Sequence, residues 1–170
     1  MTDPNIVKVR DLSVEAKGVP ILKRINLDIP RHRITVLLGP SGCGKTTLLK
    51  SLNRLTDLHP ALRVSGSILI DDEDVFHPVR DITTIRQKMG LLSQKPYPLP
   101  MSIYKNMAYG LKIQGIADKQ VIRHKVEQHL REVGLWEEVK NRLHSPAARL
   151  SIGQQQRLCL ARGLAVGPEI

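Results

Sequence analysis

The chain has 170 residues, of which 41% are hydrophobic and 25% are charged, a composition typical of one globular domain rather than of a disordered chain. No apolar run approaches the roughly 20 residues that a membrane-spanning helix needs, and the first residues lack the basic and apolar segments of a signal peptide. The two cysteines, Cys43 and Cys159, have no metal-like spacing. We therefore expect a cytosolic protein whose cysteines are reduced thiols.

The charge balance is strongly basic, with 26 lysines and arginines against 16 aspartates and glutamates, for a formal net charge of +10. Such an excess can attract nucleic acid or an anionic membrane surface. The basic residues are dispersed, however, and only 3% of the residues are aromatic. This pattern favours a solvated basic surface, near lipid headgroups, over a nucleic-acid-binding site.

The first forty residues contain three segments with strand character. Residues 6–14 and 21–29 are strand-like, and residues 15–20 between them form a turn. Residues 34–38 are a short apolar run of β-branched residues and leucine, which is typical of a buried parallel strand. The sequence therefore predicts an antiparallel β unit that leads into a parallel α/β core.

Residues 39–46 fit the phosphate-binding pattern G-x-x-x-x-G-K-[ST] without a mismatch. The motif follows a predicted strand and precedes a helical pattern at 47–55, which is the context that its mechanism needs. An ordinary glycine-rich turn between a strand and a helix is the alternative, and the two flanks disfavour it. We therefore interpret residues 39–46 as a nucleotide-binding P-loop.

The chemistry of a P-loop assigns roles to these residues. Glycines let backbone N–H groups turn inward around an oligophosphate, and the helix N-terminus adds partial positive charge. Lys45 would reach the β- and γ-phosphates, and the Thr46 hydroxyl would hold Mg²⁺. The residues predicted to bind the nucleotide are Gly39, Pro40, Ser41, Gly42, Cys43, Gly44, Lys45, Thr46 and Thr47.

Residues 64–70 are predicted to form a further strand, and four consecutive carboxylates follow it at 71–74. Four carboxylates suggest a metal site, but one consecutive run cannot direct all of them at a single ion. A solvated loop is therefore the favoured interpretation. Next, residues 82–88 can form a short helix with Asp81 as its cap, and residues 89–93 are predicted to form a strand that delivers Gln94.

The pattern becomes helical after Gln94. Three alternating prolines between residues 95 and 100 exclude a regular helix or a central strand and mark a boundary. Ser102 can cap a helix that runs to about residue 113 and ends at Gly115. Asp118 can open another helix that ends at Gly134.

The later helical segment contains one histidine that could be a metal ligand and two apolar residues that could dock a short helix. His129 lies on the apolar face of the second helix, and no other ligand-type residue accompanies it at metal-site spacing. It is therefore interpreted as a core or boundary residue rather than a metal ligand. Trp136 and Leu143 are predicted to dock a short helix, which completes a helical subdomain over residues 95–150.

A third informative stretch runs from residue 149 to residue 158, where Ser151 stands at a helix start before an apolar pattern. Alone, it indicates only a serine-capped buried helix. Together with the P-loop and Gln94, in this order, it resembles the ATP-binding subunits of ABC transporters. Their shared features are a Walker A loop, a glutamine loop, a helical subdomain and the Leu-Ser-Gly-Gly-Gln signature.

The resemblance is strongest to the phosphate-import subfamily, and it extends over essentially the whole chain. It is carried by residues 39–45, 94–96, 100–104, 136–144 and 150–162. It implies an α/β fold, a P-loop NTPase with a RecA-like core, an N-terminal antiparallel β unit and an inserted α-helical subdomain, C-terminally incomplete. The parts would be an ATP-binding core (1–94), the helical subdomain (95–150) and a signature helix that returns to the core (151–170).

The resemblance also implies site roles and partners. Lys45 and Gln94 would be catalytic, and Thr46 and Gln94 would be oriented toward Mg²⁺ and the attacking water. Three signature residues would contact the ATP held by a second subunit in a head-to-tail dimer: Ser151, Gly153 and Gln154. The other implied partners are transmembrane permease subunits and, indirectly, an extracytoplasmic phosphate-binding protein, with the chain peripheral on the cytoplasmic side of the cell membrane.

Three departures from the family pattern qualify this function. Ile152 stands where the signature usually has glycine, and Glu15 and Ala16 stand near the position of an aromatic residue that stacks on adenine. The chain also stops at Ile170, before the strand that supplies the Walker B carboxylates. We therefore expect a truncated product that hydrolyses ATP poorly, and a catalytically inactive nucleotide-binding fragment is the alternative. A nucleic-acid-associated ABC-type ATPase is a further one, suggested only by the net charge.

Overall fold

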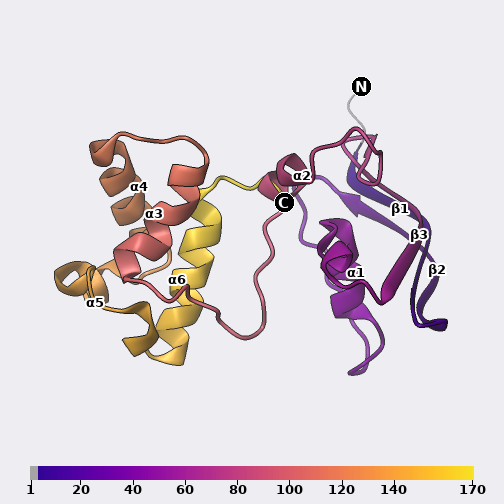
Figure 1. The fold of residues 1–170 in the computed structure, drawn as a ribbon, viewed down its shortest axis with the longest axis horizontal. Helices are drawn as coiled ribbons and strands as arrows, with labels where there is room; N and C mark the ends of the chain where they lie inside the picture. Colours follow the sequence, from indigo (N-terminus) through magenta and orange to yellow (C-terminus); the bar gives the residue numbers. More distant parts are fainter. Residues whose placement is uncertain (1–3) are drawn as a thin grey trace. The chain divides into compact units, whose positions relative to one another are not determined.

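The computed structural model describes residues 4–170, which form two compact units. We call the first, which ends at Arg86, the β unit, and the second, Gln87–Ile170, the helical unit (Figure 1). The three-part division at residues 94 and 150 stays a prediction. Within the described residues, no helix has both the length and the apolar character that crossing a membrane would require.

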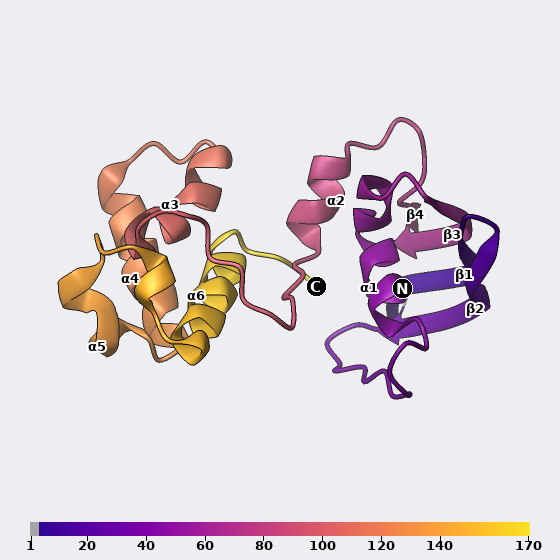
Figure 2. The same cartoon turned by 60° about the horizontal axis from the view of Figure 1, so that its bottom comes forward.

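The β unit is built on a four-stranded antiparallel sheet in the order β2-β1-β3-β4 (Figure 2). Its strands are β1 (Asn5–Ala16), β2 (Val19–Pro30), β3 (Leu62–Ile70) and β4 (Glu73–Asp74). The sequence-based prediction of the first three is confirmed. Helix α1 (Lys45–Leu52) packs against β2 with Leu48 and Leu52 buried, and a short 3-10 helix, η1 (Leu55–Leu58), follows.

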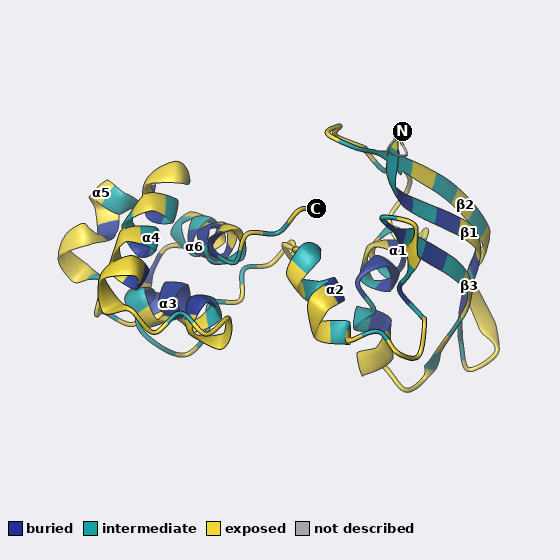
Figure 3. Ribbon diagram, turned by 90° about the horizontal axis from the view of Figure 1, so that it is seen from above, coloured by how far each residue is buried: buried dark blue, intermediate teal, exposed yellow. Residues whose placement is uncertain are grey.

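A bulge keeps the apolar side chains of β1 on one face of the sheet. Buried and exposed positions alternate along the strand (Figure 3), but Val9 and Leu12 are three residues apart and both are fully buried. The strand register shifts between them, where Asp11 has a φ of 46°. Gly66 lies opposite, and a Cβ there would come within 2.6 Å of the Asp11 carbonyl oxygen. Glycine at position 66 therefore lets β3 approach the bulge.

The predictions of a parallel strand at 34–38 and of a strand at 89–93 are wrong. Both segments lack helix or strand structure, and the side chains of Ile34 and Leu38 are 94% and 88% exposed. A parallel strand requires a neighbour that supplies hydrogen bonds along its length. Among the described residues, no strand pairs with either segment. In contrast, α2 (Ile82–Lys88) forms as predicted, with the Asp81 carboxylate accepting from the Thr83 N–H at 2.9 Å.

The acidic run at 71–74 is held by four different partners in the β unit. Asp71 pairs with Arg31, and Glu73 pairs with Arg80. Asp72 accepts from the Lys8 ammonium at 2.6 Å, and Asp74 accepts from the Phe76 N–H at 2.9 Å. The four carboxylates therefore fasten separate segments. Within the described residues, no group of three His, Cys, Asp or Glu side chains could hold a metal ion.

The helical unit is built around one apolar core. Its helices are α3 (Ile103–Ile113), α4 (Lys119–Glu132), α5 (Trp136–Val139) and α6 (Ile152–Ala165), with short 3-10 helices η2 (Lys140–Arg142) and η3 (Ala147–Arg149). Helix α6 packs against both α3 and α4 (Figure 1). Leu111, Leu130 and Leu158, one from each of these three helices, are fully buried. The partly buried Trp136 and Leu143 pack against this core as predicted.

The helix starts were predictable because their caps are local. The Ser102 hydroxyl accepts from the Lys105 N–H at 3.2 Å at the start of α3. Asp118 accepts from the N–H groups of Gln120 and Val121 at 2.7 and 3.2 Å at the start of α4. Each contact satisfies a first-turn donor that has no partner within the helix.

Candidate functional site

The predicted phosphate loop lies in the β unit and leads directly into α1. Gly44 is the N-cap of the helix, with a φ of 95° that favours glycine. A Cβ at Gly44 would come within 2.6 Å of the Leu22 Cδ2 and 3.3 Å of the Ile21 carbonyl oxygen. Only glycine therefore fits where the loop passes over β2, and this close approach fixes the loop against the sheet.

Lys45 folds back over the same loop. Its ammonium donates to the carbonyl oxygens of Gly39 and Pro40, each at 2.7 Å, and lies 3.4 Å from the Cys43 sulfur. Two of the three ammonium donors are thus used on the backbone of residues 39–40. The contacts hold a positive charge at the mouth of the loop, where an anion would bind.

The start of α1 adds backbone donors to this charge. Within the described residues, no side chain caps the helix, and its first turn contains no acidic residue. The first intrahelical hydrogen bond runs from the Leu48 N–H to the Gly44 carbonyl oxygen at 2.9 Å. The N–H groups of Lys45, Thr46 and Thr47 therefore remain available for an anion, which the helix dipole also favours.

The donor set at this end of α1 fits an oligophosphate with Mg²⁺. Thr46 is exposed in the first turn, so its hydroxyl can act as one neutral oxygen ligand. Magnesium commonly takes one or two protein oxygens and completes its shell with phosphate oxygens and water.

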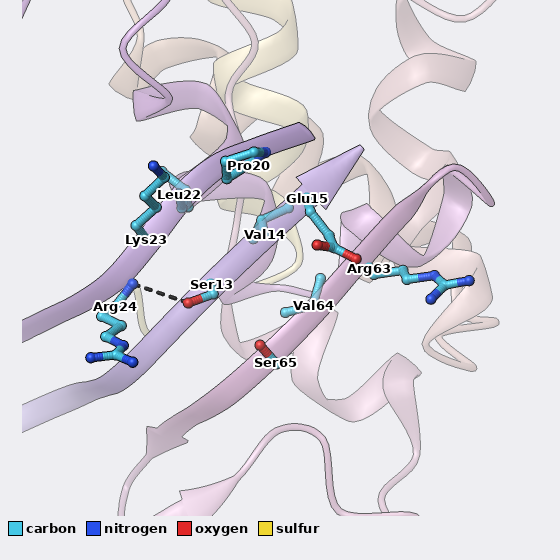
Figure 4. Close-up of a pocket in the computed structure, with 10 residues that line it drawn as sticks. All are labelled: Ser13, Val14, Glu15, Pro20, Leu22, Lys23, Arg24, Arg63, Val64 and Ser65. Carbon is cyan, nitrogen blue, oxygen red and sulfur yellow. Dashed lines mark hydrogen bonds between the residues drawn. The ribbon is translucent and has the colours of Figure 1, made fainter. Parts of the chain in front are cut away.

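A groove with a volume of about 670 Å³ lies on the sheet of the β unit (Figure 4). The Ser13 hydroxyl accepts from the Arg24 N–H at 3.0 Å, and Glu15 stands opposite Arg63 on the neighbouring strand. Leu22, which abuts Gly44, also lines the groove. Its ten residues are Ser13, Val14, Glu15, Pro20, Leu22, Lys23, Arg24, Arg63, Val64 and Ser65, none of them aromatic.

The predicted signature residues lie at the start of α6 in the helical unit. Ser151 is the N-cap, and its hydroxyl accepts from the Gln154 N–H at 3.3 Å. The Gln154 side-chain oxygen in turn accepts from the Ser151 N–H at 3.0 Å, which completes a capping box. The Ile152 side chain is 70% exposed and projects into solvent. The backbone N–H of Ile152 belongs to the first turn of α6. A Cβ at Gly153 would meet nothing within 4 Å.

A network that the sequence did not predict holds the signature residues. Glu138 of α5 accepts from the Gln154 side-chain N–H through one carboxylate oxygen and from the Arg157 guanidinium through the other, each at 2.7 Å. Arg157 also donates to the Gly134 carbonyl oxygen at 2.7 Å. The hydrogen bond from Gln154, followed by that from Arg157, lowers the pKa of the Glu138 carboxyl.

Gln94 is exposed and lies in the helical unit, so the structure groups it with α6. It lines a hollow of about 370 Å³ with residues of the preceding segment and of the helix. These residues are Leu92, Ser93, Gln94, Pro96, Gln156, Arg157 and Leu160. Lys45 and Thr46 belong to the β unit, so the proposed joint action of Gln94 and Thr46 on Mg²⁺ stays a prediction.

Side chains fasten the proline-rich segment that follows Gln94. Asn106 is fully buried, and its amide both accepts from the Leu99 N–H at 2.7 Å and donates to the Leu99 carbonyl oxygen at 3.1 Å. Arg162 of α6 donates to the Tyr97 carbonyl oxygen and to the Asn106 amide oxygen, each at 3.1 Å. The segment after Gln94 is therefore tied to α3 and to the signature helix.

Comparison with known proteins defines the class. Residues 22–170 match the model of a family described as ABC transporter. The chain belongs to this family, which confirms the resemblance found in the sequence. A solved structure, cbiO1 from Clostridium perfringens, part of the ABC transporter complex cbiONQ, superposes with a TM-score of 0.78 at 29% identity. It covers 98% of this chain, and this chain covers 63% of it, which confirms the predicted fold class.

Curated relatives narrow the comparison. The phosphate import ATP-binding proteins PstB 1 of Streptococcus pyogenes serotype M3 and serotype M1 are each 47% identical to this chain over 170 residues. The matches cover 100% of this chain and 67% of each relative. The chain thus spans about two thirds of the length of these relatives.

Proposed function

We propose that this chain binds ATP with Mg²⁺ and acts as the ATP-binding, energy-coupling subunit of an ABC importer. The observation that carries the proposal is the geometry at Gly44 and Lys45. Glycine is required where the loop crosses β2, a lysine ammonium is held over the loop, and the first turn of α1 presents unpaired N–H groups. Together these features form a site for a polyanion.

Each group at this site has a distinct role in the proposed reaction, the transfer of the γ-phosphoryl group to water. Backbone N–H groups in the first turn of α1, those of Lys45, Thr46 and Thr47, bind and orient the phosphates. The Lys45 ammonium stabilises negative charge on the β- and γ-phosphates. Thr46 would hold Mg²⁺, which supplies further charge neutralisation when bound. Gln94 would orient the attacking water.

The second part of the proposal is a head-to-tail dimer in which the signature of one copy meets the nucleotide of another. Ser151 offers a hydroxyl O–H, and Ile152 and Gly153 offer first-turn N–H groups at the start of a 14-residue helix. Hydroxyl, N–H groups and helix dipole suit a γ-phosphate for the same physical reasons as the P-loop does. Closure of this dimer would drive the permease subunits, since ATP would bind the closed state more tightly than the open one.

Inorganic phosphate is the proposed cargo, because the relatives that cover the whole chain at 47% identity are named phosphate import proteins. The proposed partners are permease subunits and, through them, an extracytoplasmic phosphate-binding protein. The proposed location is the cytoplasmic face of the membrane. Cargo selection would belong to those partners rather than to this chain.

Nucleotide binding without turnover is the second candidate function. It is favoured by the acidic run at 71–74, whose carboxylates are all engaged with other segments of the β unit and so do not serve a reacting water. The two candidates separate when binding and turnover are measured independently on the same chain.

The test is fluorescent ATP-analogue binding and Mg-ATP turnover by the purified chain, with Lys45→Ala beside it. Saturable binding that Lys45→Ala abolishes, together with phosphate release, supports the ATPase. Binding without phosphate release favours the second candidate. Failure of the wild-type chain to bind any nucleotide contradicts both.

A further inference from the structure

Glu138 is the one side chain that joins the signature residues to the rest of the helical unit through a carboxylate. It lies on α5, 16 residues before Gln154, and accepts hydrogen bonds from both Gln154 and Arg157. We infer that Glu138 is a positioning residue that holds Gln154 in the capping box, so that Gln154 shapes the anion site without contacting the phosphate. This inference rests on the proposed binding of a γ-phosphate at the start of α6.

The Gln154 side chain has its polar atoms committed within its own unit. Its oxygen accepts from the Ser151 N–H at 3.0 Å, and its nitrogen donates to Glu138 at 2.7 Å. The backbone N–H of Gln154 is also used, since it donates to the Ser151 hydroxyl. The bond to Glu138 uses one of the two N–H donors of this nitrogen and fixes the direction of the other.

The groups that remain for an anion are different ones. The Ser151 hydroxyl accepts from Gln154, and its own O–H stays free to donate. The N–H groups of Ile152 and Gly153 have no acceptor within the helix, as expected for a first turn. Gly153 is open to close approach because no atom lies within 4 Å of the position of a Cβ. The anion site therefore consists of these three donors.

The charge on Glu138 does not oppose an anion, because Arg157 neutralises it. The lowered pKa of Glu138 keeps its carboxyl ionised at neutral pH. The Arg157 guanidinium bonds to that carboxylate and to the Gly134 carbonyl oxygen, each at 2.7 Å. The pair presents no net charge to the start of α6, and it still orients the Gln154 amide.

The core fixes where Glu138 stands. Leu135 and Val139, on either side of it in the chain, are fully buried, and so is Leu158 on α6. The carboxylate is thereby held over the first turn of α6 by packing. Its neighbour Glu137 is different, because it pairs only with Arg131 and Lys140 among the described residues and does not reach α6. Glu137 is therefore a matched control.

The first measurement is hydrogen exchange at the Gln154 backbone amide in the full chain. Glu138→Ala should speed this exchange at least about fivefold, the factor that a lost cap corresponds to, and Glu137→Ala should leave it unchanged. Unchanged exchange in Glu138→Ala, or an equal effect of Glu137→Ala, overturns the inference. This readout requires neither ATP nor a partner, so it stands even where the wild-type chain binds ATP without forming a dimer.

The second measurement uses a donor–acceptor swap, Glu138→Gln with Gln154→Glu. In the swapped chain the new amide at 138 can donate to the new carboxylate at 154 and accept from Arg157. The carboxylate at 154 can still accept from the Ser151 N–H, as glutamate does in capping boxes. The swap should restore slow exchange at the backbone amide of residue 154, whereas Glu138→Ala alone should raise the ATP concentration for half-maximal dimerisation about tenfold.

ATP-dependent dimerisation of Glu138→Ala separates a positioning role from a direct one. If the Gln154 amide bound the phosphate itself, its release from Glu138 would not weaken dimerisation. That result would overturn the inference. Affinity of each monomer for nucleotide should be equal in all these variants. A wild-type chain that binds ATP but never dimerises would contradict the proposed dimer. The hydrogen-exchange result would then decide whether Glu138 positions Gln154.

Discussion

The starts of α1 and α6 are both helix N-termini at which we propose that phosphate binds, but they are built in opposite ways. At α1 a lysine ammonium lies over a glycine loop, and no side chain caps the helix among the described residues. At α6 a serine and a glutamine cap the helix reciprocally, and a carboxylate orients the glutamine. The first site attracts anions by charge, whereas the second recognises them by fixed neutral donors.

This difference suits two successive binding steps. A charged, flexible donor such as lysine gives affinity to a site that must capture a free polyanion. Neutral donors held by a capping box give little affinity alone. Because they are already ordered, however, they lose little conformational entropy when an anion binds to them. A closed dimer would then depend on the geometry of α6, and the nucleotide affinity of one chain would depend on α1.

The largest effect is expected from removing the charge at α1. Lys45→Ala should weaken nucleotide binding on the order of 100-fold, because hydrogen bonds to charged groups contribute roughly 1.5–3 kcal/mol. Lys50→Ala, in the last turn of the same helix, is the control and should leave affinity near wild type. Titration with a fluorescent ATP analogue measures both. Equal losses in the two variants would show that net charge, rather than the loop, attracts the nucleotide.

Replacing a glycine with alanine should change the free energy of unfolding in opposite directions at the two sites. Gly44→Ala forces a side chain into Leu22 at a φ of 95°, and it should lower the free energy of unfolding by about 1–3 kcal/mol. Gly153→Ala adds a methyl to open space within a helix, and it should raise stability by about 0.5–1 kcal/mol. Urea unfolding followed by circular dichroism measures both changes. Destabilisation by Gly153→Ala would contradict the open geometry at α6.

A smaller loss of stability is expected when a serine cap is removed, and comparing two such caps separates the structural role of a cap from a role in binding. Ser151→Ala removes the hydroxyl from the capping box, so it should cost about 1 kcal/mol of stability and also impair ATP-dependent dimerisation. Ser102→Ala removes the equivalent cap from α3 and should cost a similar amount without changing dimerisation. Analytical ultracentrifugation with and without ATP gives the comparison. Matching dimerisation defects in the two variants would point to loss of fold alone.

The sequence predicted those parts of the site whose determinants are contiguous. The caps at Ser102, Asp118 and Ser151 each lie within a few residues of the groups that they bind, so spacing alone identifies them. The predicted P-loop is likewise one contiguous motif, and it leads into α1 as the sequence indicates. Residues 34–38 have the composition of a parallel strand, but strand formation depends on a neighbour that local pattern does not supply. The bond between Glu138 and Gln154 joins α5 to α6, and no periodicity relates two positions 16 residues apart on different helices.

The smallest expected effect is a pH dependence of stability that arises from Glu138. The hydrogen bond from Gln154, then that from Arg157, lowers the pKa of Glu138 from its ordinary value of 4.5. A lowered carboxyl pKa contributes stability that is present above about pH 4.5 and is lost as pH falls through the folded-state pKa. Wild type should therefore exceed Glu138→Gln in unfolding midpoint at neutral pH, and the difference should shrink on acidification to about pH 3.

Glu137→Gln is the control for that experiment, because the pKa of Glu137 is also lowered, chiefly by Lys140, yet its carboxylate does not contact α6. Both variants should show the same direction of change in the unfolding midpoint. Only Glu138→Gln should also change the exchange rate of the Gln154 amide relative to wild type at the same pH, because only that carboxylate bonds to the Gln154 side chain. A difference that grows on acidification would contradict the sign of the pKa shift. Equal amide exchange in the two variants would contradict the link from Glu138 to the capping box.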